Sequence, residues 1–215
     1  MIKLYGLPVS NYYAMVKVFM LEKGFEFEEV HIEPSYSYPF LDISPMGKVP
    51  IIELNEGYLS ETTSILGFLE TCIPDMPMSL SDPFLRAKMA ELLKIHELYL
   101  ETQARRLYGY VFLGQPLNAQ TADEVKPILE RGLTAVDKLA RFSPWLMGDS
   151  FTVADVFAYY TYAMVRPTAQ KVWGWDVVND VSGLREWLER VSARPSFRAV
   201  NAERAEAIKK LVDRR

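Results

Sequence analysis

A proline stands at the beginning of the apolar run VPIIEL, residues 49–54, and it restricts where this run can lie in a fold. A proline has no N–H to donate, so it is tolerated at a sheet edge, at the start of a strand or at a bulge. The run is followed by the turn residues NEG at 55–57 and the short stretch YLS at 58–60. This order predicts a β-hairpin whose first strand begins near Pro50.

The residues on either side of this hairpin alternate strand and helix patterns. IKLYG at residues 2–6 and FEFEEVHI at 25–32 alternate in the manner of strands, and a helical pattern separates them. Residues 33–47 are irregular and contain three prolines. With the hairpin and a helix through Ile65, the order β-α-β-β-β-α predicts a small α/β domain over residues 1–78.

The rest of the chain has helical patterns. Residues 74–83, PDMPMSLSDP, contain three prolines and are predicted to be a linker. An apolar stripe at helical spacing then runs from Leu85 to Leu107. Further helices are expected near 121–140, from 151, near 184–191, and as a short helix after Pro195. We therefore predict an all-helical domain over residues 84–215.

The composition excludes several classes of protein. A hydrophobic fraction of 49% and a charged fraction of 24% are typical of a soluble globular chain. The net charge of −4 and the isoelectric point near 5.4 argue against binding to nucleic acid or to an anionic membrane. Neither a signal-peptide core nor an apolar run of about 18–20 residues is present. We therefore expect a cytoplasmic protein.

The cysteine and histidine content excludes common metal and redox sites. Cys72 is the single cysteine, so neither an internal disulfide nor a CxxC pair can form. His31 and His96 are the two histidines, too few for an ordinary histidine zinc site. We expect no metal, and we expect Cys72 to be a small buried side chain.

The sequence SETT at residues 60–63 places one carboxylate among hydroxyl groups where the helix after the hairpin begins. A helix N-terminus presents free N–H groups that attract a carboxylate, and Thr62 adds a hydroxyl. Glu61 is suited to an ammonium group, so the pair predicts a clamp for an α-amino acid zwitterion. Alternatively, Ser60 caps the helix and Glu61 favours its dipole, each contributing about 1 kcal/mol or less.

The Val49–Pro50 bond has two interpretations. A cis bond would leave the Val49 N–H and C=O free to pair with an extended peptide ligand, as one strand pairs with another. A trans proline would simply protect the edge of the sheet.

Four segments together resemble the glutathione S-transferase family over nearly the entire chain. SPMGKVPIIELNEGYLSETTSILGFLE is similar to that family's N-P-x-G-x-V-P … E-S-x-x-I-x-x-Y-L pattern, with Ser44 and Thr62 replacing its usual Asn and Ser. LYGLPVSNYYAMVKVFMLEKGFEFE resembles its first strand, catalytic loop and first helix, and GDSFTVADVFAYYTYAM and LREWLERVSARPSFRAV resemble parts of its helical domain. In the third segment, Thr152 and Asp155 have capping-box spacing, which indicates a role in folding. The resemblance implies a thioredoxin-like N-terminal domain followed by a glutathione-transferase-type helical C-terminal domain.

The resemblance implies glutathione as co-substrate and assigns residues to it. Pro50 would be cis, the Val49 backbone would bind the cysteinyl part, and Glu61 and Thr62 would hold the γ-glutamyl end. Lys48 is the cation nearest to this pattern and is our candidate for the glycine carboxylate, although a solvated loop lysine is an equal alternative.

The resemblance also places Ser10 where serine-type classes keep a catalytic hydroxyl. This hydroxyl would donate a hydrogen bond to the glutathione thiolate rather than act as a nucleophile. Asn11 is a second candidate donor. Alternatively, Ser10 or Asn11 merely caps the first helix.

The second substrate is expected to be a small, hydrophobic electrophile. Tyr12, Arg106, Tyr110 and Tyr162 are candidates for its pocket, although aromatic residues at helical spacing more often belong to a core. The expected reaction is conjugation of glutathione to this electrophile by a homodimer, the assembly usual in the family. The alternatives are a glutathione-dependent disulfide reductase or isomerase on the same fold, and a binding module without catalysis.

Overall fold

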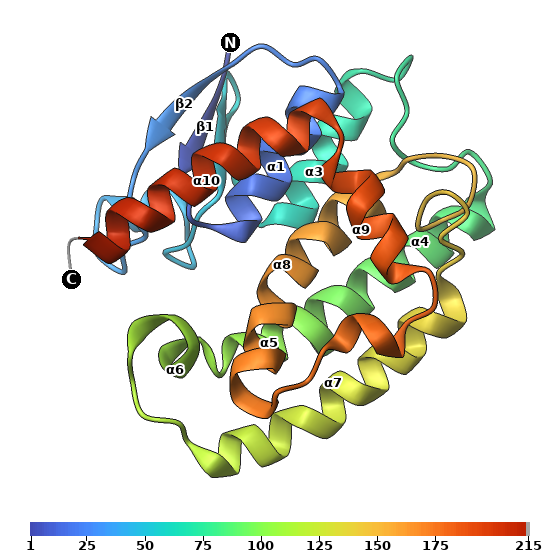
Figure 1. Cartoon of the computed structure of the whole chain (residues 1–215). Helices are drawn as coiled ribbons and strands as arrows, with labels where there is room; N and C mark the ends of the chain where they lie inside the picture. Colours follow the sequence, from blue (N-terminus) through green and yellow to red (C-terminus); the bar gives the residue numbers. More distant parts are fainter. Residues whose placement is uncertain (214–215) are drawn as a thin grey trace. The chain divides into compact units, whose positions relative to one another are not determined.

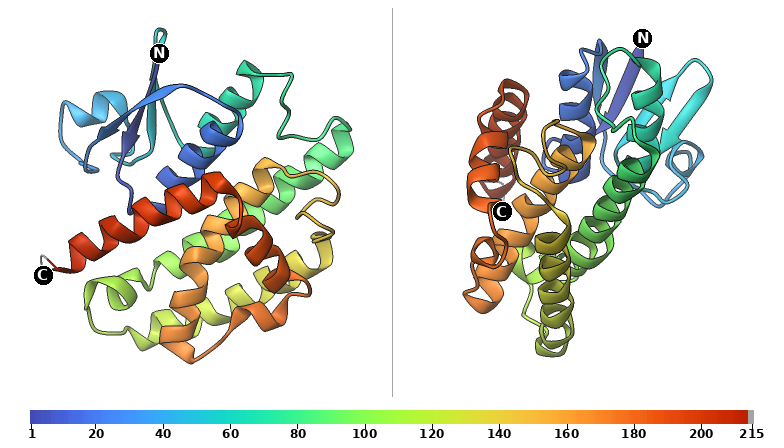
Figure 2. Two further views of the ribbon diagram at one scale, coloured as in Figure 1. Left: turned by 45° about the horizontal axis from the view of Figure 1, so that its top comes forward. Right: turned by 90° about the vertical axis from the view of Figure 1, so that its right-hand side faces the viewer.

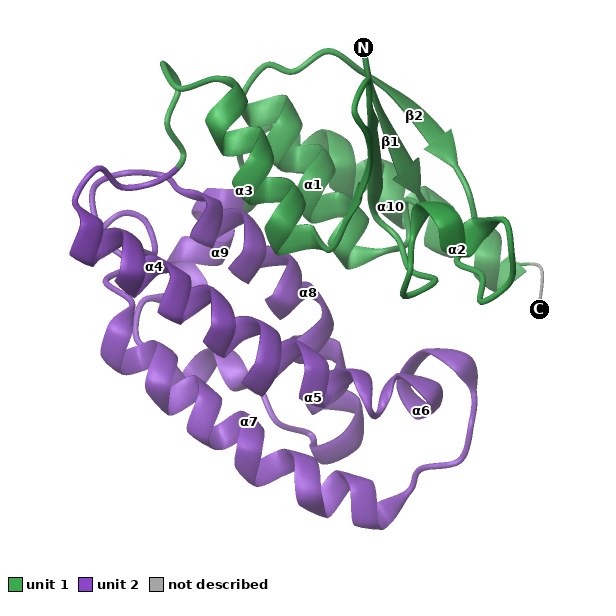
Figure 3. Ribbon diagram, turned by 180° about the vertical axis from the view of Figure 1, so that it is seen from behind, with its two compact units in different colours: residues 1–78, 192–215 green, residues 79–191 purple. Residues whose placement is uncertain are grey.

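The computed structural model describes residues 1–213 (Figure 1). The chain divides into two compact units, coloured separately in Figure 3. Unit 1 comprises residues 1–78 together with the C-terminal segment that begins at Ser192, and unit 2 comprises residues 79–191. The α/β pattern predicted for the first part of the chain and the helical pattern predicted for the second are both found.

Unit 1 contains a four-stranded sheet in the order β2-β1-β3-β4. The strands are β1 (Ile2–Gly6), β2 (Phe27–His31), β3 (Ile51–Leu54) and β4 (Gly57–Ser60). β1 pairs with β2 in parallel and with β3 in antiparallel orientation, and β3 pairs with β4 in antiparallel orientation. The pairing of Leu54 with Gly57 closes the tight turn and confirms the predicted hairpin.

The helices of unit 1 are α1 (Asn11–Glu22), α2 (Phe40–Ile43), α3 (Thr62–Cys72) and α10 (Pro195–Asp213). α1 contacts β1, α3 and α10, and Figure 2 shows the blue and red helices of α1 and α10 side by side. As a result the side chains from Tyr13 to Met20 are all buried, not one face alone. The short α2 was not predicted, because prolines precede and follow it.

Two lysines, Lys17 in α1 and Lys23 at its C-cap, are buried and carry ion pairs. Lys23 is 1% exposed, and its ammonium donates to the Glu70 carboxylate at 2.8 Å and to the Glu70 carbonyl at 3.1 Å. Lys17 is 4% exposed and donates to Glu29 at 2.7 Å and to Glu203. Burying an ammonium is costly unless it is paired and hydrogen-bonded, and both lysines meet that condition.

Unit 2 differs from the predicted helical domain of residues 84–215 at the C-terminal end, because unit 2 ends at residue 191. The predicted short helix after Pro195 is the long helix α10, and it belongs to unit 1. Charged contacts explain this placement, since Arg194 donates to Glu22 at 3.0 Å and Lys17 binds Glu203. These contacts join segments more than 170 residues apart, which no local pattern reveals.

Unit 2 is helical. Its elements are α4 (Pro83–Ile95), the π-helix η1 (His96–Glu101), α5 (Thr102–Arg105), α6 (Tyr108–Leu113), α7 (Ala119–Leu139), α8 (Val153–Trp173), the 3-10 helix η2 (Val177–Asp180) and α9 (Leu184–Ser192). The stripe predicted from Leu85 to Leu107 therefore follows a helix with a widened turn. π-Turns of this kind are uncommon and often lie at functional positions.

The Thr152–Asp155 pair forms the predicted capping box at the start of α8. The buried Asp155 carboxylate accepts from the Thr152 N–H at 2.8 Å and from the Thr152 hydroxyl at 3.1 Å. It also accepts from the Leu146 N–H at 2.8 Å and from the Trp187 indole N–H at 2.8 Å. One carboxylate thus joins α8, α9 and the preceding loop.

His96 in η1 is expected to make unit 2 sensitive to acid. Its Nδ1 is 2.8 Å from the Leu92 carbonyl, its ring is 1% exposed, and burial lowers its pKa to about 4. The unfolded chain takes up this proton near pH 6.5, so stability is fully present above pH 6.5 and falls as the pH drops toward 4. We expect a loss of about 3 kcal/mol over this range. Urea unfolding of wild type and His96→Phe at several pH values tests this, since an equal pH dependence in both would contradict it.

Candidate active site

Strand register brings three of the predicted site segments to one end of the sheet. Tyr5 in β1 pairs with Ile51 in β3, and Ile51 pairs in turn with Ser60 in β4. β1 and β4 end at the same end of the sheet at which β3 begins, because β3 is antiparallel to both. The chain segments that contain Ser10, Pro50 and Glu61 therefore all adjoin this end of the sheet.

Ser10 is the N-cap residue of α1. Its hydroxyl oxygen accepts from the Tyr13 N–H at 3.3 Å, and its own N–H donates to the Leu7 carbonyl at 2.9 Å. Gly6 allows this loop to be compact, because a Cβ there would lie 2.4 Å from the Tyr13 ring. The oxygen accepts in the cap, so its O–H proton is left to donate elsewhere. The cap predicted as an alternative is therefore present, and it does not exclude the donor role.

Asn11, the second predicted donor, is the first residue of α1 and is 3% exposed. Ser10 is more accessible than its neighbour, since it is half-buried. The assignment of the thiolate donor to Ser10 or Asn11 stays a prediction.

The loop before β3 is held by Ser44. The Ser44 hydroxyl donates to the Lys48 carbonyl at 2.8 Å and accepts from the Lys48 N–H at 3.0 Å. The Val49–Pro50 bond is cis, as the resemblance implies. Val49 is half-buried, whereas Lys48 is exposed and makes no ion pair among residues 1–213. The sequence shows Ser44 in place of the family's usual asparagine, but the two hydrogen bonds by which Ser44 holds the loop before Val49 are seen only in the structure.

Glu61 lies directly before α3 in an unusual backbone conformation. Its φ is +69° and its ψ is 116°, although it is not a glycine. Such conformations cost about 1–3 kcal/mol and cluster at functional sites. The Glu61 side chain is exposed and makes no capping hydrogen bond, while Thr62 beside it is 7% exposed. The alternative in which Ser60 caps the helix is wrong, because Glu61 is the N-cap residue.

The predicted pocket residues are distributed over both units. Tyr12 is half-buried in unit 1. In unit 2, Arg106 is exposed and ion-paired with Glu124, and Tyr110 is half-buried with the Lys171 ammonium 5.1 Å from its ring centre. Of the four candidates, these three stay predicted pocket residues.

The prediction that Tyr162 lines the electrophile pocket is wrong. It borders a depression of about 410 Å³ on α8, but its side chain is 0% exposed. Its ring packs edge-on against His96 and Trp187 at centroid distances of 5.6 and 6.3 Å. The Tyr162 side chain therefore belongs to the core of unit 2, because aromatic residues at helical spacing face neighbouring helices.

A polar cluster around the buried Glu101 carboxylate was not predicted. The Glu101 side chain is 1% exposed and accepts from Arg105 Nε at 3.2 Å and from the Tyr108 hydroxyl at 3.3 Å. The Arg105 guanidinium also lies 5.1 Å from the centre of the Tyr108 ring. The i, i+4 spacing of Glu101 and Arg105 was visible in the sequence, but not the burial of the carboxylate within a π-helix.

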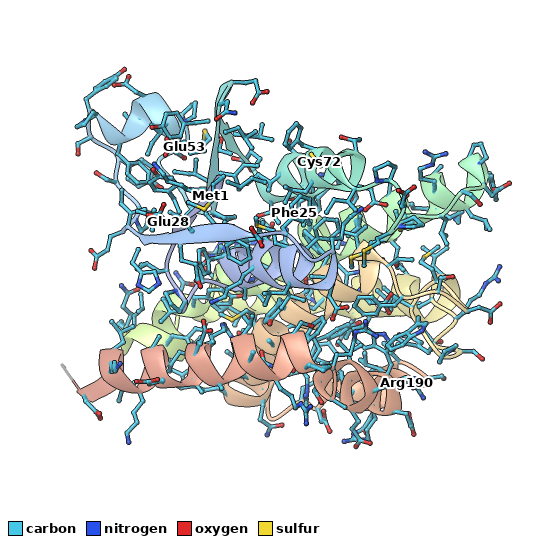
Figure 4. All side chains as sticks on the ribbon, turned by 90° about the horizontal axis from the view of Figure 1, so that it is seen from above. Met1, Phe25, Glu28, Glu53, Cys72 and Arg190 are labelled. Carbon is cyan, nitrogen blue, oxygen red and sulfur yellow. The ribbon has the colours of Figure 1, made fainter. Side chains whose placement is uncertain are left out.

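Three further observations concern Cys72, metal-binding groups and membrane-spanning helices. Cys72 is exposed rather than buried, at the C-terminal end of α3, where Figure 4 labels it. Among residues 1–213, no group of three or more histidine, cysteine, aspartate or glutamate side chains is placed to hold a metal ion. Within the same residues, no helix has the length and hydrophobicity needed to cross a bilayer.

Two family models and a curated relative match this chain. The family model described as "Glutathione S-transferase, N-terminal domain" matches residues 4–75, and "Glutathione S-transferase, C-terminal domain" matches residues 119–190. A "Glutathione S-transferase" of Pseudomonas putida F1 is 34% identical over 204 residues, which is 95% of this chain and 93% of that protein.

Solved structures show the same fold. Glutathione transferase F7 from Populus trichocarpa has a TM-score of 0.77 at 21% identity, with 95% of this chain and 99% of that chain covered. A glutathione S-transferase from Rhodospirillum rubrum F11 has a TM-score of 0.75 at 24% identity, with coverage of 93% and 91%. The predicted fold class, a thioredoxin-like domain followed by a glutathione-transferase-type helical domain, is confirmed. The chain belongs to the glutathione S-transferase family.

Proposed function

We propose that this protein is a serine-type glutathione transferase that adds the thiolate of glutathione to a small, hydrophobic electrophile. The observation that supports this most is the meeting of the Ser10, Val49–Pro50 and Glu61–Thr62 segments at one end of the sheet. α1 and α3 both begin at these segments, so two helix N-termini adjoin the same end of the sheet. Helix N-termini favour negative charge, and bound glutathione would have carboxylates and a thiolate.

The proposed chemistry is stabilisation of the thiolate. A free thiol with a pKa of about 8.5 is about 3% ionised at pH 7. Lowering this pKa by about two units requires about 2.7 kcal/mol and makes the thiolate the major form. The Ser10 hydroxyl can contribute, because its oxygen accepts from Tyr13 while its proton donates to sulfur. No covalent intermediate with the enzyme is needed, since the thiolate itself attacks the electrophile.

The remaining contacts would orient glutathione. Glu61 would accept from the γ-glutamyl ammonium, and the Thr62 N–H and hydroxyl would donate to the adjacent carboxylate. The Val49 backbone would pair with the cysteinyl part, and Lys48 would meet the glycine carboxylate. For the electrophile pocket we retain Tyr12, Arg106 and Tyr110 as candidates.

Replacing Glu61 is expected to weaken glutathione binding about 10- to 100-fold, because a charge-assisted hydrogen bond contributes about 1.5–3 kcal/mol. Glu61→Gln removes the charge with little change of shape. Glu61→Gly removes the side chain but suits a φ of +69°, so it is expected to weaken binding without destabilising unit 1. Isothermal titration with glutathione measures the Kd.

Glu56→Gln, in the exposed hairpin turn, is the matched control for this series and is expected to bind like wild type. Wild-type affinity in Glu61→Gln would remove the clamp from the proposal.

The first alternative, a disulfide reductase or isomerase, has less support from the structure. Position 10 is a serine, and Cys72 lies at the opposite end of α3 from Glu61, about 16 Å away along the helix. The protein therefore offers no thiol at Ser10 to form a mixed disulfide. Reduction of a disulfide substrate without any conjugation of an activated aryl halide would nevertheless establish this alternative.

The second alternative is a binding module without catalysis. A module whose glutathione site is dead is expected not to be retained on immobilised glutathione, whereas a transferase is expected to be retained.

We also propose a homodimer in the cytoplasm. Large apolar side chains are exposed on α4 and η1, among them Phe84 at 71%, Leu98 at 46% and Tyr99 at 50%. Association that covers these side chains would remove apolar surface from water and is therefore favoured. A monomeric mass by sedimentation equilibrium would contradict the dimer.

A further inference from the structure

Unit 1 contains a cleft of about 580 Å³ to which the proposed reaction assigns no role. Three segments line it: the loop of residues 7–9, the end of β2 with the residues after it, and the C-terminal half of α10. This volume lies within the range of about 300–1,000 Å³ that is usual for small-molecule sites. Ser10, Val49, Glu61 and Thr62 do not line the cleft.

One part of the cleft is apolar. The contributing residues are Leu7, Pro8, Val9, Ala207 and Leu211. They come from the loop after β1 and from α10, whose Ala207 is the smallest side chain among them. A compound with a hydrophobic body can therefore bury apolar surface here, at about 25 cal/mol per Å².

The other part of the cleft is acidic. Glu29, Glu33, Glu203 and Glu206 line it, with Lys210 and His31 as the basic groups. The buried Lys17 ammonium lies behind this wall and is shared by Glu29 and Glu203, and Lys210 pairs with Glu206 at 2.6 Å. The four carboxylates of the cleft therefore outnumber the two ammonium groups by two.

The Lys17 ammonium holds two of these carboxylates, Glu29 and Glu203, in place. Burial raises the pKa of the Glu29 carboxyl, but the Lys17 ammonium and the Tyr13 hydroxyl outweigh burial and hold this pKa below its ordinary value. Lys17 joins β2 to α10 through its two carboxylate partners, so the β2 side and the α10 side of the cleft have a defined spacing. An ionised carboxylate accepts several hydrogen bonds, and those of Glu29 and Glu203 are only partly used.

We propose that this cleft binds small amphipathic cations, namely primary ammonium compounds with an apolar body. The ammonium group would donate to the carboxylate wall while the apolar body lies against residues 7–9 and α10. Charge complementarity selects this occupant, because an anion of the same shape would meet the same carboxylates unfavourably. None of the proposed glutathione contacts lines this cleft, so the proposal does not rest on the transferase activity.

The test is a titration of the full-length, ¹⁵N-labelled protein with 2-phenylethylammonium, followed by amide chemical shifts. We expect saturable shifts at Val9, His31 and Ala207. The anion 3-phenylpropionate has a similar shape and is expected to bind at least about tenfold more weakly. Raising the ionic strength is expected to weaken binding of the cation.

Two variants locate the site. Glu33→Gln/Glu206→Gln removes two exposed carboxylates of the cleft and is expected to weaken cation binding about tenfold, whereas Glu56→Gln/Glu186→Gln, with the same change in net charge, is expected to bind like wild type. Ala207→Phe fills the apolar part and is expected to abolish binding. Any of three results would overturn the proposal: no saturation, equal binding of cation and anion, or wild-type affinity in the Glu33/Glu206 variant.

Discussion

Ser10→Gly is expected to lower kcat for conjugation at pH 7 by about 10- to 100-fold and to leave the KM for glutathione nearly unchanged. The lost hydrogen bond to the thiolate is charge-assisted and contributes about 1.5–3 kcal/mol. KM is expected to stay nearly unchanged because the proposed anchoring contacts come from Glu61 and Thr62, at the far end of the tripeptide. The deficit in kcat is expected to shrink as the pH rises past about 8.5, where glutathione ionises without help. Initial rates with an activated aryl halide measure these effects.

Comparison of substitutions at position 10 separates catalysis from helix capping. Ser10 accepts from the Tyr13 N–H, so Ser10→Ala also loses a cap that contributes about 1 kcal/mol, whereas glycine loses a few tenths. Turnover is expected to fall equally in the two variants although their stabilities differ, and Ser10→Thr is expected to retain turnover. Wild-type turnover in Ser10→Gly would transfer the donor role to Asn11.

Asp155→Ala is expected to cause the largest loss of stability, on the order of 4 kcal/mol. The substitution leaves the Leu146 N–H, the Thr152 N–H and the Trp187 indole N–H buried without their acceptor. Each orphaned donor costs about 1–3 kcal/mol, against a total stability of about 5–15 kcal/mol for a typical domain. The urea midpoint, followed by far-ultraviolet circular dichroism, measures the effect.

Asp149→Ala is the control for Asp155, since Asp149 is exposed and lies six residues away. Its midpoint is expected to match wild type within about 0.5 kcal/mol. Equal midpoints for the Asp149 and Asp155 variants would show that the capping box does not hold α8, α9 and their loop together.

The predictions that succeeded depend on local chemistry. The hairpin follows from a turn sequence between two apolar stretches, and the N-cap position of Ser10 follows from a polar residue before a helical pattern. Both can be recognised within a few residues, because turns and caps are formed by neighbouring groups.

The features that were not predicted depend on contacts between distant parts of the chain, or they leave the apolar pattern of the sequence unchanged. α10 was predicted to be short, because Phe197 and Val200 are its only buried residues in the described part of the chain. Lys17 would have been assigned to the surface on residue type alone, and its burial requires Glu203, 186 residues later. The π-helix keeps the same apolar stripe as an α-helix, so periodicity did not distinguish them.

The state of the glutathione sulfur in the complex tests the central claim most directly. The ultraviolet absorbance of the thiolate, recorded as a difference between bound and free glutathione across pH, gives the pKa of the bound thiol. We predict a value about two units below the free value of about 8.5 in wild type, and a value shifted back toward the free one in Ser10→Gly. A wild-type complex whose sulfur titrates like free glutathione would contradict the account.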